Sequence, residues 1–125
     1  MARRVLAEVS DGVHSVAEAQ LRRLPTDVGF PPPRWNVDLT DATGAWVARP
    51  DAYWEEAALV VEVQSREWHF TPAEWAATME RTNRLSRLGY DVQQFPPSRI
   101  TGDPAGVVRE LRAAYDAGLR RPRAS

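Results

Sequence analysis

The sequence predicts an α/β fold in which a mixed β-sheet is flanked by helices. Residues 59–64 (Leu-Val-Val-Glu-Val-Gln) form an almost continuous aliphatic run, which is typical of a strand covered on both faces. Residues 35–40 before it alternate apolar with polar residues, which predicts a half-buried strand, and a second strand is predicted at 45–53. Helix-like patterns precede and follow these segments, so the predicted element order is α-β-β-β-α-β-α.

The composition indicates one globular domain. The chain has 125 residues, 43% of them hydrophobic, and five tryptophans. We therefore expect a single domain over 1–125, with its core at about 13–117 and a basic flexible tail at 118–125. Cysteine is absent, which excludes disulfides, zinc–thiolate sites and thiol catalysis. No apolar run approaches the length of a membrane span or a signal segment, so we expect a cytoplasmic protein without a membrane partner.

The N-terminal region is predicted to hold two short helices. The first lies in residues 1–12 and ends at Gly12. Ser15 and Glu18 form a capping box that opens the second helix, which continues to about Leu24. The residues of this helix predicted to face the core are Val16, Leu21 and Leu24. A run of prolines at 31–33 then ends the helical region.

The strands are predicted to build a mixed sheet. Residues 35–40 and 45–53 form two strands joined by a turn. Pro50 cannot donate a hydrogen bond to a neighbouring strand, so it marks an edge or a bend. The strand at 59–64 completes an antiparallel meander, and a strand at 90–95 follows a crossover helix. A strand that returns through such a helix is parallel to its predecessor.

Two further helices have clear boundary signals. Thr71 is the predicted N-cap of a helix that ends at Gly89, with proline and glutamate in its first turn. The predicted inner stripe of this helix is Trp75, Met79, Thr82, and Leu85 or Leu88. Asp103 caps the last helix. Its predicted apolar face is Val108, Leu111 and Tyr115.

Glu62 is the most informative residue, because an ionised carboxylate within a buried strand needs a cation, a metal ion or hydrogen-bond donors around it. Asp51 follows Pro50 at the bend of the neighbouring strand. Two carboxylates on adjacent strands can converge on one hard divalent cation. The alternative is that Glu62 pairs with a buried arginine while Asp51 caps a turn. The spacing alone leaves both interpretations open.

These residues also carry a resemblance to a known family. Pro50-Asp51, ten intervening residues and Glu62-Val63-Gln64 resemble the PD-(D/E)xK nuclease signature, with glutamine in place of lysine. The stretch from Glu62 to Trp68-His69, followed by an arginine-bearing helix, is similar to the very-short-patch-repair endonuclease-like branch. That branch includes actinobacterial domains of unknown function, often fused behind a winged-helix module. The resemblance covers residues 13–117 and implies a restriction-endonuclease-like fold.

The resemblance also implies roles for individual side chains. Asp51 and Glu62 would be the ligands of Mg²⁺ or Mn²⁺, and Glu18 would match an acidic residue brought to the site from the first helix. His69 would act as a general base or a phosphate contact. Gln64 departs from the pattern, because the branch has an acidic residue there and the wider superfamily has lysine. A neutral amide ligates a metal weakly and supplies neither charge nor a proton acceptor.

All 16 basic residues are arginine. Arg81, Arg84 and Arg87 form a stripe on one helix and, together with Arg66, could grip DNA phosphates. The alternative is a solvated helix face paired with nearby acids. Trp68 and Trp75 could stack on bases, although tryptophans beside a helix start are more often part of the core.

The sequence thus leads to two functional hypotheses. The first is a magnesium-dependent DNA endonuclease or nickase that uses Asp51, Glu62, Gln64, His69 and Glu18. The second is a catalytically degenerate domain of the same fold. It would bind nucleic acid or a protein partner, in a regulator or in a toxin–antitoxin-like context. Cleavage of both DNA strands would favour a homodimer, and a winged-helix regulator is the expected fused or associated partner.

Overall fold

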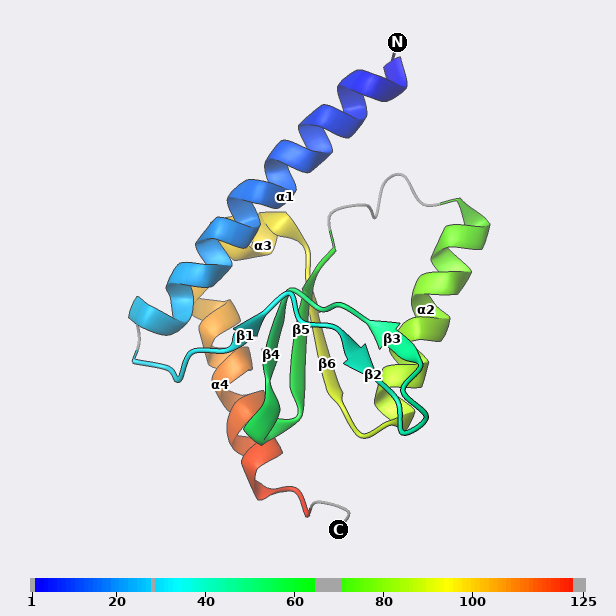
Figure 1. Cartoon of the computed structure of the whole chain (residues 1–125). Coiled ribbons are helices and arrows are strands. Elements are labelled where there is room, and N and C mark those ends of the chain that lie inside the picture. The colour runs from blue at the N-terminus through cyan, green and yellow to red at the C-terminus, as the bar shows by residue number, and fades with distance from the viewer. Residues whose placement is uncertain (1, 28, 65–70, 123–125) are drawn as a thin grey trace.

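The computed structural model describes residues 2–27, 29–64 and 71–122; the side chains of residues 2–11, 13, 14 and 27 lie outside this description. Within these ranges the predicted α/β fold is confirmed, with helices on both faces of a mixed sheet (Figure 1). The elements in chain order are α1 (Ala2–Asp27), β1 (Arg34–Trp35), β2 (Leu39–Thr40), β3 (Trp46–Ala48), β4 (Ala52–Trp54), the 3₁₀ turn η1 (Glu55–Ala57), β5 (Leu59–Val63), α2 (Pro72–Arg87), β6 (Asp91–Phe95), α3 (Pro97–Gly102) and α4 (Pro104–Arg120).

The main sheet has the strand order β1-β4-β5-β6. β1 pairs antiparallel with β4, and β4 pairs antiparallel with β5. β6, which returns after α2, pairs parallel with β5. Every residue of β5 is buried. The predicted antiparallel meander, the parallel return and the central buried strand are therefore confirmed.

The two longer strands predicted at 35–40 and 45–53 are each divided into two short strands, which corrects that prediction. Asn36 has a positive φ of 52° and turns the chain after β1, so β1 joins the main sheet and β2 leaves it. Pro50 separates β3 from β4, in line with its inability to donate a hydrogen bond. β2 and β3 pair as a separate hairpin, whose turn is held by hydrogen bonds to the carboxylate of Asp41.

The N-terminal region is one continuous helix, so the prediction of two short helices is wrong. α1 passes through Gly12 and Ser15 without interruption. A glycine inside a helix costs only about 1 kcal/mol relative to alanine, so packing of the later turns can override the local stop signal. The residues of α1 in the core are Ala17, Leu21 and Leu24. Val16 was expected beside them but is 62% exposed.

The larger core lies between one face of the main sheet and the helices α1, α3 and α4. Trp54 is its largest fully buried side chain, and its ring centroid is 5.5 Å from that of Phe30. The indole Nε1 of Trp54 donates a hydrogen bond of 2.7 Å to the carbonyl oxygen of Pro31. The residues of β5 in this core are Leu59, Val61 and Val63.

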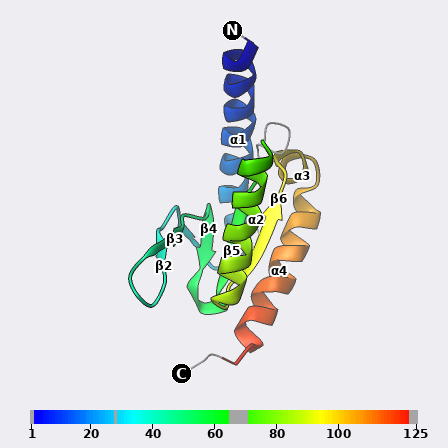
Figure 2. The ribbon, with the colours of Figure 1, turned by 90° about the vertical axis from the view of Figure 1, so that its right-hand side faces the viewer.

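The smaller core lies on the opposite face of the main sheet. Val60 of β5 and Leu85 of α2 meet there with residues of the β2–β3 hairpin. The hairpin residues in this core are Leu39, Val47 and Ala48. Figure 2 looks onto α2, with the hairpin to one side of it and α4 to the other. α2 and the hairpin therefore cover this face together.

The predicted boundaries of α2 are confirmed, but its predicted inner stripe is largely wrong. The hydroxyl oxygen of Thr71 caps the helix, and Gly89 follows its end with a φ of 99°. Leu85 is fully buried, whereas Trp75 and Met79 are 49% and 46% exposed. Leu88 is also exposed. Helical periodicity alone predicts which residues share a face but not how far the sheet extends beneath them.

The C-terminal region holds α3, which the sequence did not predict, and the predicted last helix. Asp103 caps α4 through a hydrogen bond from the backbone N–H of Gly106. α4 continues to Arg120, so the expected flexible tail does not begin at residue 118. Gly118 is buried against Ala57, and Arg121 donates a 2.8 Å hydrogen bond to the carbonyl oxygen of that residue. The residues of the predicted apolar face of α4, all at least half-buried, are Val108, Leu111 and Tyr115.

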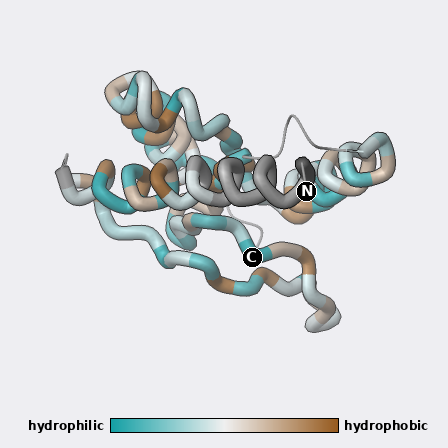
Figure 3. The backbone as a smooth tube through the Cα atoms, turned by 90° about the horizontal axis from the view of Figure 1, so that it is seen from above, coloured by the Kyte–Doolittle hydropathy of each residue, from teal (hydrophilic) through white to brown (hydrophobic). Residues whose placement is uncertain are grey.

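Hydrophilic and hydrophobic segments alternate along the helices in Figure 3. Among the described residues, no helix combines the length and the apolar character that crossing a membrane requires. The helices are amphipathic, as is usual in a globular domain.

Candidate functional site: paired carboxylates beside a cleft

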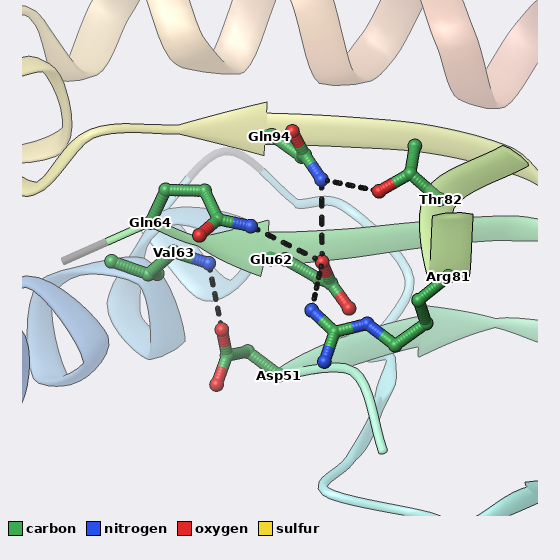
Figure 4. A network of polar contacts seen from close by, with 7 residues as sticks. All are labelled: Asp51, Glu62, Val63, Gln64, Arg81, Thr82 and Gln94. Carbon is green, nitrogen blue, oxygen red and sulfur yellow. Dashed lines mark hydrogen bonds and ion pairs between the residues drawn. The ribbon is translucent and has the colours of Figure 1, made fainter. Parts of the chain in front are cut away.

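The two carboxylates singled out in the sequence lie next to each other across two antiparallel strands. The register of β4 and β5 pairs Ala52 with Val61. The next residues, Asp51 and Glu62, are therefore opposite each other. The Oδ2 atom of Asp51 accepts a 2.7 Å hydrogen bond from the backbone N–H of Val63 (Figure 4). This bond fixes the Asp51 carboxylate at the C-terminal end of β5.

Three nitrogen donors surround the Oε2 atom of Glu62 (Figure 4). The side-chain amides of Gln64 and Gln94 each lie 3.4 Å from it, and a terminal guanidinium nitrogen of Arg81 lies 3.5 Å from it. Glu62 itself is only 6% exposed. All three distances are longer than the usual 2.7–3.2 Å, so the contacts are weak ones. We call this group of side chains the carboxylate site; its members are Asp51, Glu62, Gln64, Arg81 and Gln94.

Glu62 therefore has an arginine partner, as the structural alternative from the sequence proposed. Burial raises the pKa of Glu62 above its ordinary value, and the nearby Asp51 carboxylate also raises it. The charge of Arg81 and the amide of Gln94 lower it, without cancelling the effect of burial. Additional positive charge beside Glu62 would favour its ionised form.

Arg81 has an unmet hydrogen-bonding requirement. Its Nε atom is buried and has no acceptor in the described part of the chain. Its side chain is 38% exposed as a whole, and it meets Glu62 through one long contact and not through a bidentate pair. An acceptor oxygen from water or a ligand would satisfy this buried donor.

Glu18 reaches the neighbourhood of the site through Asn36. The side-chain amide of Asn36 donates to Glu18 Oε1 at 3.4 Å, and its backbone N–H donates to the carbonyl oxygen of Asp51 at 3.2 Å. Glu18 also pairs with Arg22 one turn later in α1. The structure thus links Glu18, through Asn36, to the loop that carries Asp51.

The arginine stripe of α2 is used in part for internal ion pairs. Arg81 meets Glu62, and a terminal nitrogen of Arg84 lies 2.7 Å from Asp41 in the β2–β3 hairpin. Arg87 is exposed. Three further residues singled out in the sequence lie outside the described residues: Arg66, Trp68 and His69.

A cleft of about 440 Å³ opens between α2 and β6, directly beside the carboxylate site. Gln64 and Gln94 belong to both, since each lines the cleft and donates to Glu62. The remaining lining residues are Trp75, Thr78, Met79, Thr82, Asn83, Phe95 and Pro96. We call this the α2–β6 cleft. It places polar side chains and exposed apolar ones around a single opening.

Gln94 is a site residue that the sequence reasoning missed. The parallel register pairs it with Glu62, and its amide also donates to the hydroxyl of Thr82 at 3.0 Å. The available signal was a pair of glutamines within a predicted strand, at 93 and 94. A polar residue near the end of a strand parallel to 59–63 would be expected on the same sheet edge as Glu62.

The site residues partly fit a divalent metal ion. Within the described ranges, no group of three or more His, Cys, Asp or Glu side chains is arranged to hold one. Mg²⁺, however, commonly binds through only one or two carboxylates and keeps several water ligands. Asp51 and Glu62 meet this smaller requirement, and a bound cation would oppose the burial that raises the pKa of Glu62.

Among curated proteins, the chain is similar to two from Mycobacterium tuberculosis. They are uncharacterized protein MT2308 of strain CDC 1551 / Oshkosh and uncharacterized protein Rv2248 of strain H37Rv. Each is 29% identical over an alignment of 123 residues, and the alignment covers 94% of this chain and 45% of the relative. The chain thus spans about half the length of the curated relatives it matches. No protein-family model and no solved structure matches the chain.

Proposed function

We propose that this domain hydrolyses phosphodiester bonds of DNA with the help of Mg²⁺ or Mn²⁺ held by Asp51 and Glu62. The observation that carries the proposal is the placement of two carboxylates opposite each other, Asp51 directly before β4 and Glu62 within β5, beside an open cleft. A bound Mg²⁺ stabilises charge on a phosphoryl group and lowers the pKa of a water ligand. The resemblance to the PD-(D/E)xK signature in the sequence supports the same assignment.

The side chains around the two carboxylates have supporting roles in this proposal. Arg81 contacts a phosphate oxygen in this proposal through the exposed part of its guanidinium, since 38% of its side chain is exposed. Gln64 holds Glu62 through its amide nitrogen. His69, which lies outside the described residues, would be the general base or phosphate contact that the resemblance implies. Glu18, near the loop of Asp51, would be the acidic residue that the resemblance brings from the first helix.

The first test is calorimetric titration of Mg²⁺ and Mn²⁺ into the wild type and two isosteric variants, Asp51→Asn and Glu62→Gln. We expect the wild type to bind and both variants to lose binding, because each removes one of the two anionic ligands. Glu80→Gln is the matched control, since Glu80 is exposed on α2 beside Arg81. Wild-type protein that binds neither ion would overturn the metal site.

The second test is cleavage of supercoiled plasmid DNA. We expect Mg²⁺-dependent nicking by the wild type and by Glu80→Gln, and none by Asp51→Asn. An asparagine oxygen can still accept the hydrogen bond from Val63, so the loop should keep its shape. Nicking that persists in Asp51→Asn would remove Asp51 from the proposed machinery.

The ion pair between Arg81 and Glu62 favours a second function, a non-cleaving domain that binds DNA. In this case Arg81 already supplies the positive charge beside Glu62, and Gln64 contributes neither charge nor a proton acceptor. Binding would be independent of metal and sensitive to salt, because arginines would contact phosphates.

Duplex DNA binding in the presence of EDTA tests this second function. Arg81→Ala combined with Arg87→Ala should weaken binding and lower its salt dependence, by roughly one counterion per lost phosphate contact. Arg109→Ala combined with Arg120→Ala is the control, since both residues are exposed on α4. If the two double variants bind equally well, α2 does not contact DNA.

A further inference from the structure

The α2–β6 cleft combines a flat aromatic surface with several amide groups. Trp75 and Met79 line it from α2 and are about half exposed, although both belong to the helix stripe expected in the core. Phe95 of β6 also lines it, but this residue is 2% exposed and belongs to the larger core. Exposed apolar side chains that gather at an opening, and are not scattered, indicate a binding surface.

The polar groups of the cleft can act as donors and acceptors. Asn83 presents an amide with two N–H donors and a carbonyl acceptor, and Gln64 presents an amide that donates one N–H to Glu62. The amide nitrogen of Gln94 already donates to Glu62 and to Thr82, so Gln94 offers its carbonyl oxygen. Thr82 adds a hydroxyl. The lining residues described here include no charged side chain. The cleft is therefore suited to a neutral, flat ligand with hydrogen-bonding edges.

We propose that the α2–β6 cleft binds an unpaired nucleobase of a DNA strand. A base stacks on tryptophan and thioether surfaces, and its edge hydrogen-bonds with asparagine and glutamine amides. The volume of about 440 Å³ lies within the range of roughly 300–1,000 Å³ typical of small-ligand sites. A peptide of acidic or basic character would lack a charged partner in this lining.

The position of the cleft connects base binding with the carboxylate site. Gln64 and Gln94 line the cleft while their amide nitrogens face Glu62 at 3.4 Å. A base held against Trp75 and Asn83 would leave its sugar and phosphate near Asp51, Glu62 and Arg81. This inference rests on the proposed function for its choice of DNA. It adds that the strand is recognised in single-stranded or locally opened form.

Fluorescence anisotropy with two labelled oligonucleotides tests the proposal. One is a short oligothymidylate, and the other is an abasic strand with the same number of phosphates but no bases. EDTA is present throughout, so the result does not depend on a metal ion. We expect the wild type to prefer the base-bearing strand on the order of tenfold, since stacking of one base on an aromatic side chain contributes that much.

Substitutions locate the base within the protein. Trp75→Ala should abolish the preference for the base-bearing strand, and Asn83→Ala should reduce it. Trp46→Ala should keep it, because Trp46 is 56% exposed and lies outside the cleft lining. Circular dichroism of each variant confirms that it is folded. If the wild type binds both strands equally, or if Trp75→Ala keeps the preference, the proposal is overturned.

The outcome is separable from that of the proposed function. If calorimetry shows no binding of Mg²⁺ or Mn²⁺, the proposed metal site is wrong. A preference for the base-bearing strand measured in EDTA would still support the base-binding cleft. Conversely, a wild type that nicks plasmid DNA with Mg²⁺ but shows no preference for bases would keep the proposed function and exclude the base-binding cleft.

Discussion

The two faces of the main sheet differ although they share the same central strand. On one face, Leu59, Val61 and Val63 meet the helices α1, α3 and α4 in a continuous apolar core. On the other face, Val60 packs on α2, but Glu62 two residues later is surrounded by amides and an arginine. The first face holds the fold together, and the second leaves a polar, partly open site.

The difference arises from how far each helix covers the sheet. α1, α3 and α4 together cover the apolar face along the whole of β5. α2 contacts the opposite face mainly at Leu85, and its earlier residues Trp75 and Met79 border the cleft. A single strand can therefore serve a core on one side and a site on the other, because successive side chains point to opposite faces.

The largest change in the free energy of unfolding is expected for a substitution on the apolar face of the sheet. Trp54→Ala should lower the free energy of unfolding by about 3–5 kcal/mol, because it empties a fully buried position that packs on Phe30. Trp75→Ala, the matched change beside the cleft, should lower it by less than about 1 kcal/mol, since Trp75 is half exposed. Equilibrium unfolding in urea measures both. Similar losses for the two variants would mean that the faces do not differ in this way.

A change of intermediate size in the free energy of unfolding is expected for substitution of Glu62, and the size of this change should depend on pH. Burial raises the pKa of Glu62 in the folded protein above its ordinary value of 4.5. The folded state therefore binds this proton more tightly than the unfolded state. The resulting stability is present below the unfolded pKa and is lost as the pH rises through the folded pKa.

Comparison of the wild type with Glu62→Gln isolates this pH dependence. The free energy of unfolding of the wild type, relative to the variant, should fall between acidic and neutral pH. Urea unfolding at a series of pH values measures the difference. A relative stability that instead rises with pH would show that the ion pair with Arg81 outweighs the cost of burying Glu62.

The smallest change in the free energy of unfolding is expected for substitution of an exposed residue from the predicted inner stripe of α2. Met79→Ala should change the free energy of unfolding by no more than about 0.5 kcal/mol, because the side chain is 46% exposed. Leu85→Ala on the same helix should cost about 2–5 kcal/mol, because Leu85 is fully buried. Thermal unfolding of both variants is the measurement. A large loss for Met79→Ala would place the cleft wall inside the core.

The sequence predicted the elements whose signals are local. Three elements were predicted correctly from such signals. They are β5 from its aliphatic run, α2 from its threonine cap and terminal glycine, and α4 from its aspartate cap. The continuity of α1 and the separation of the β2–β3 hairpin were not predicted. The stop signal at Gly12 does not end α1, and the positive φ of Asn36, which separates β1 from β2, has no signature in the hydrophobic pattern.

The candidate site likewise has one part that the sequence predicted and one part that only the tertiary structure decided. From the sequence alone, Glu62 was known to be a carboxylate in a buried strand, with Asp51 at the bend of its neighbour, because both inferences depend on patterns of adjacent residues. Only the tertiary structure decided which donors meet Glu62. Arg81 and Gln94 are 19 and 32 residues away, and strand register and helix packing bring them together. The sequence places Gln94 in a predicted strand, but no local pattern specifies the register that pairs it with Glu62.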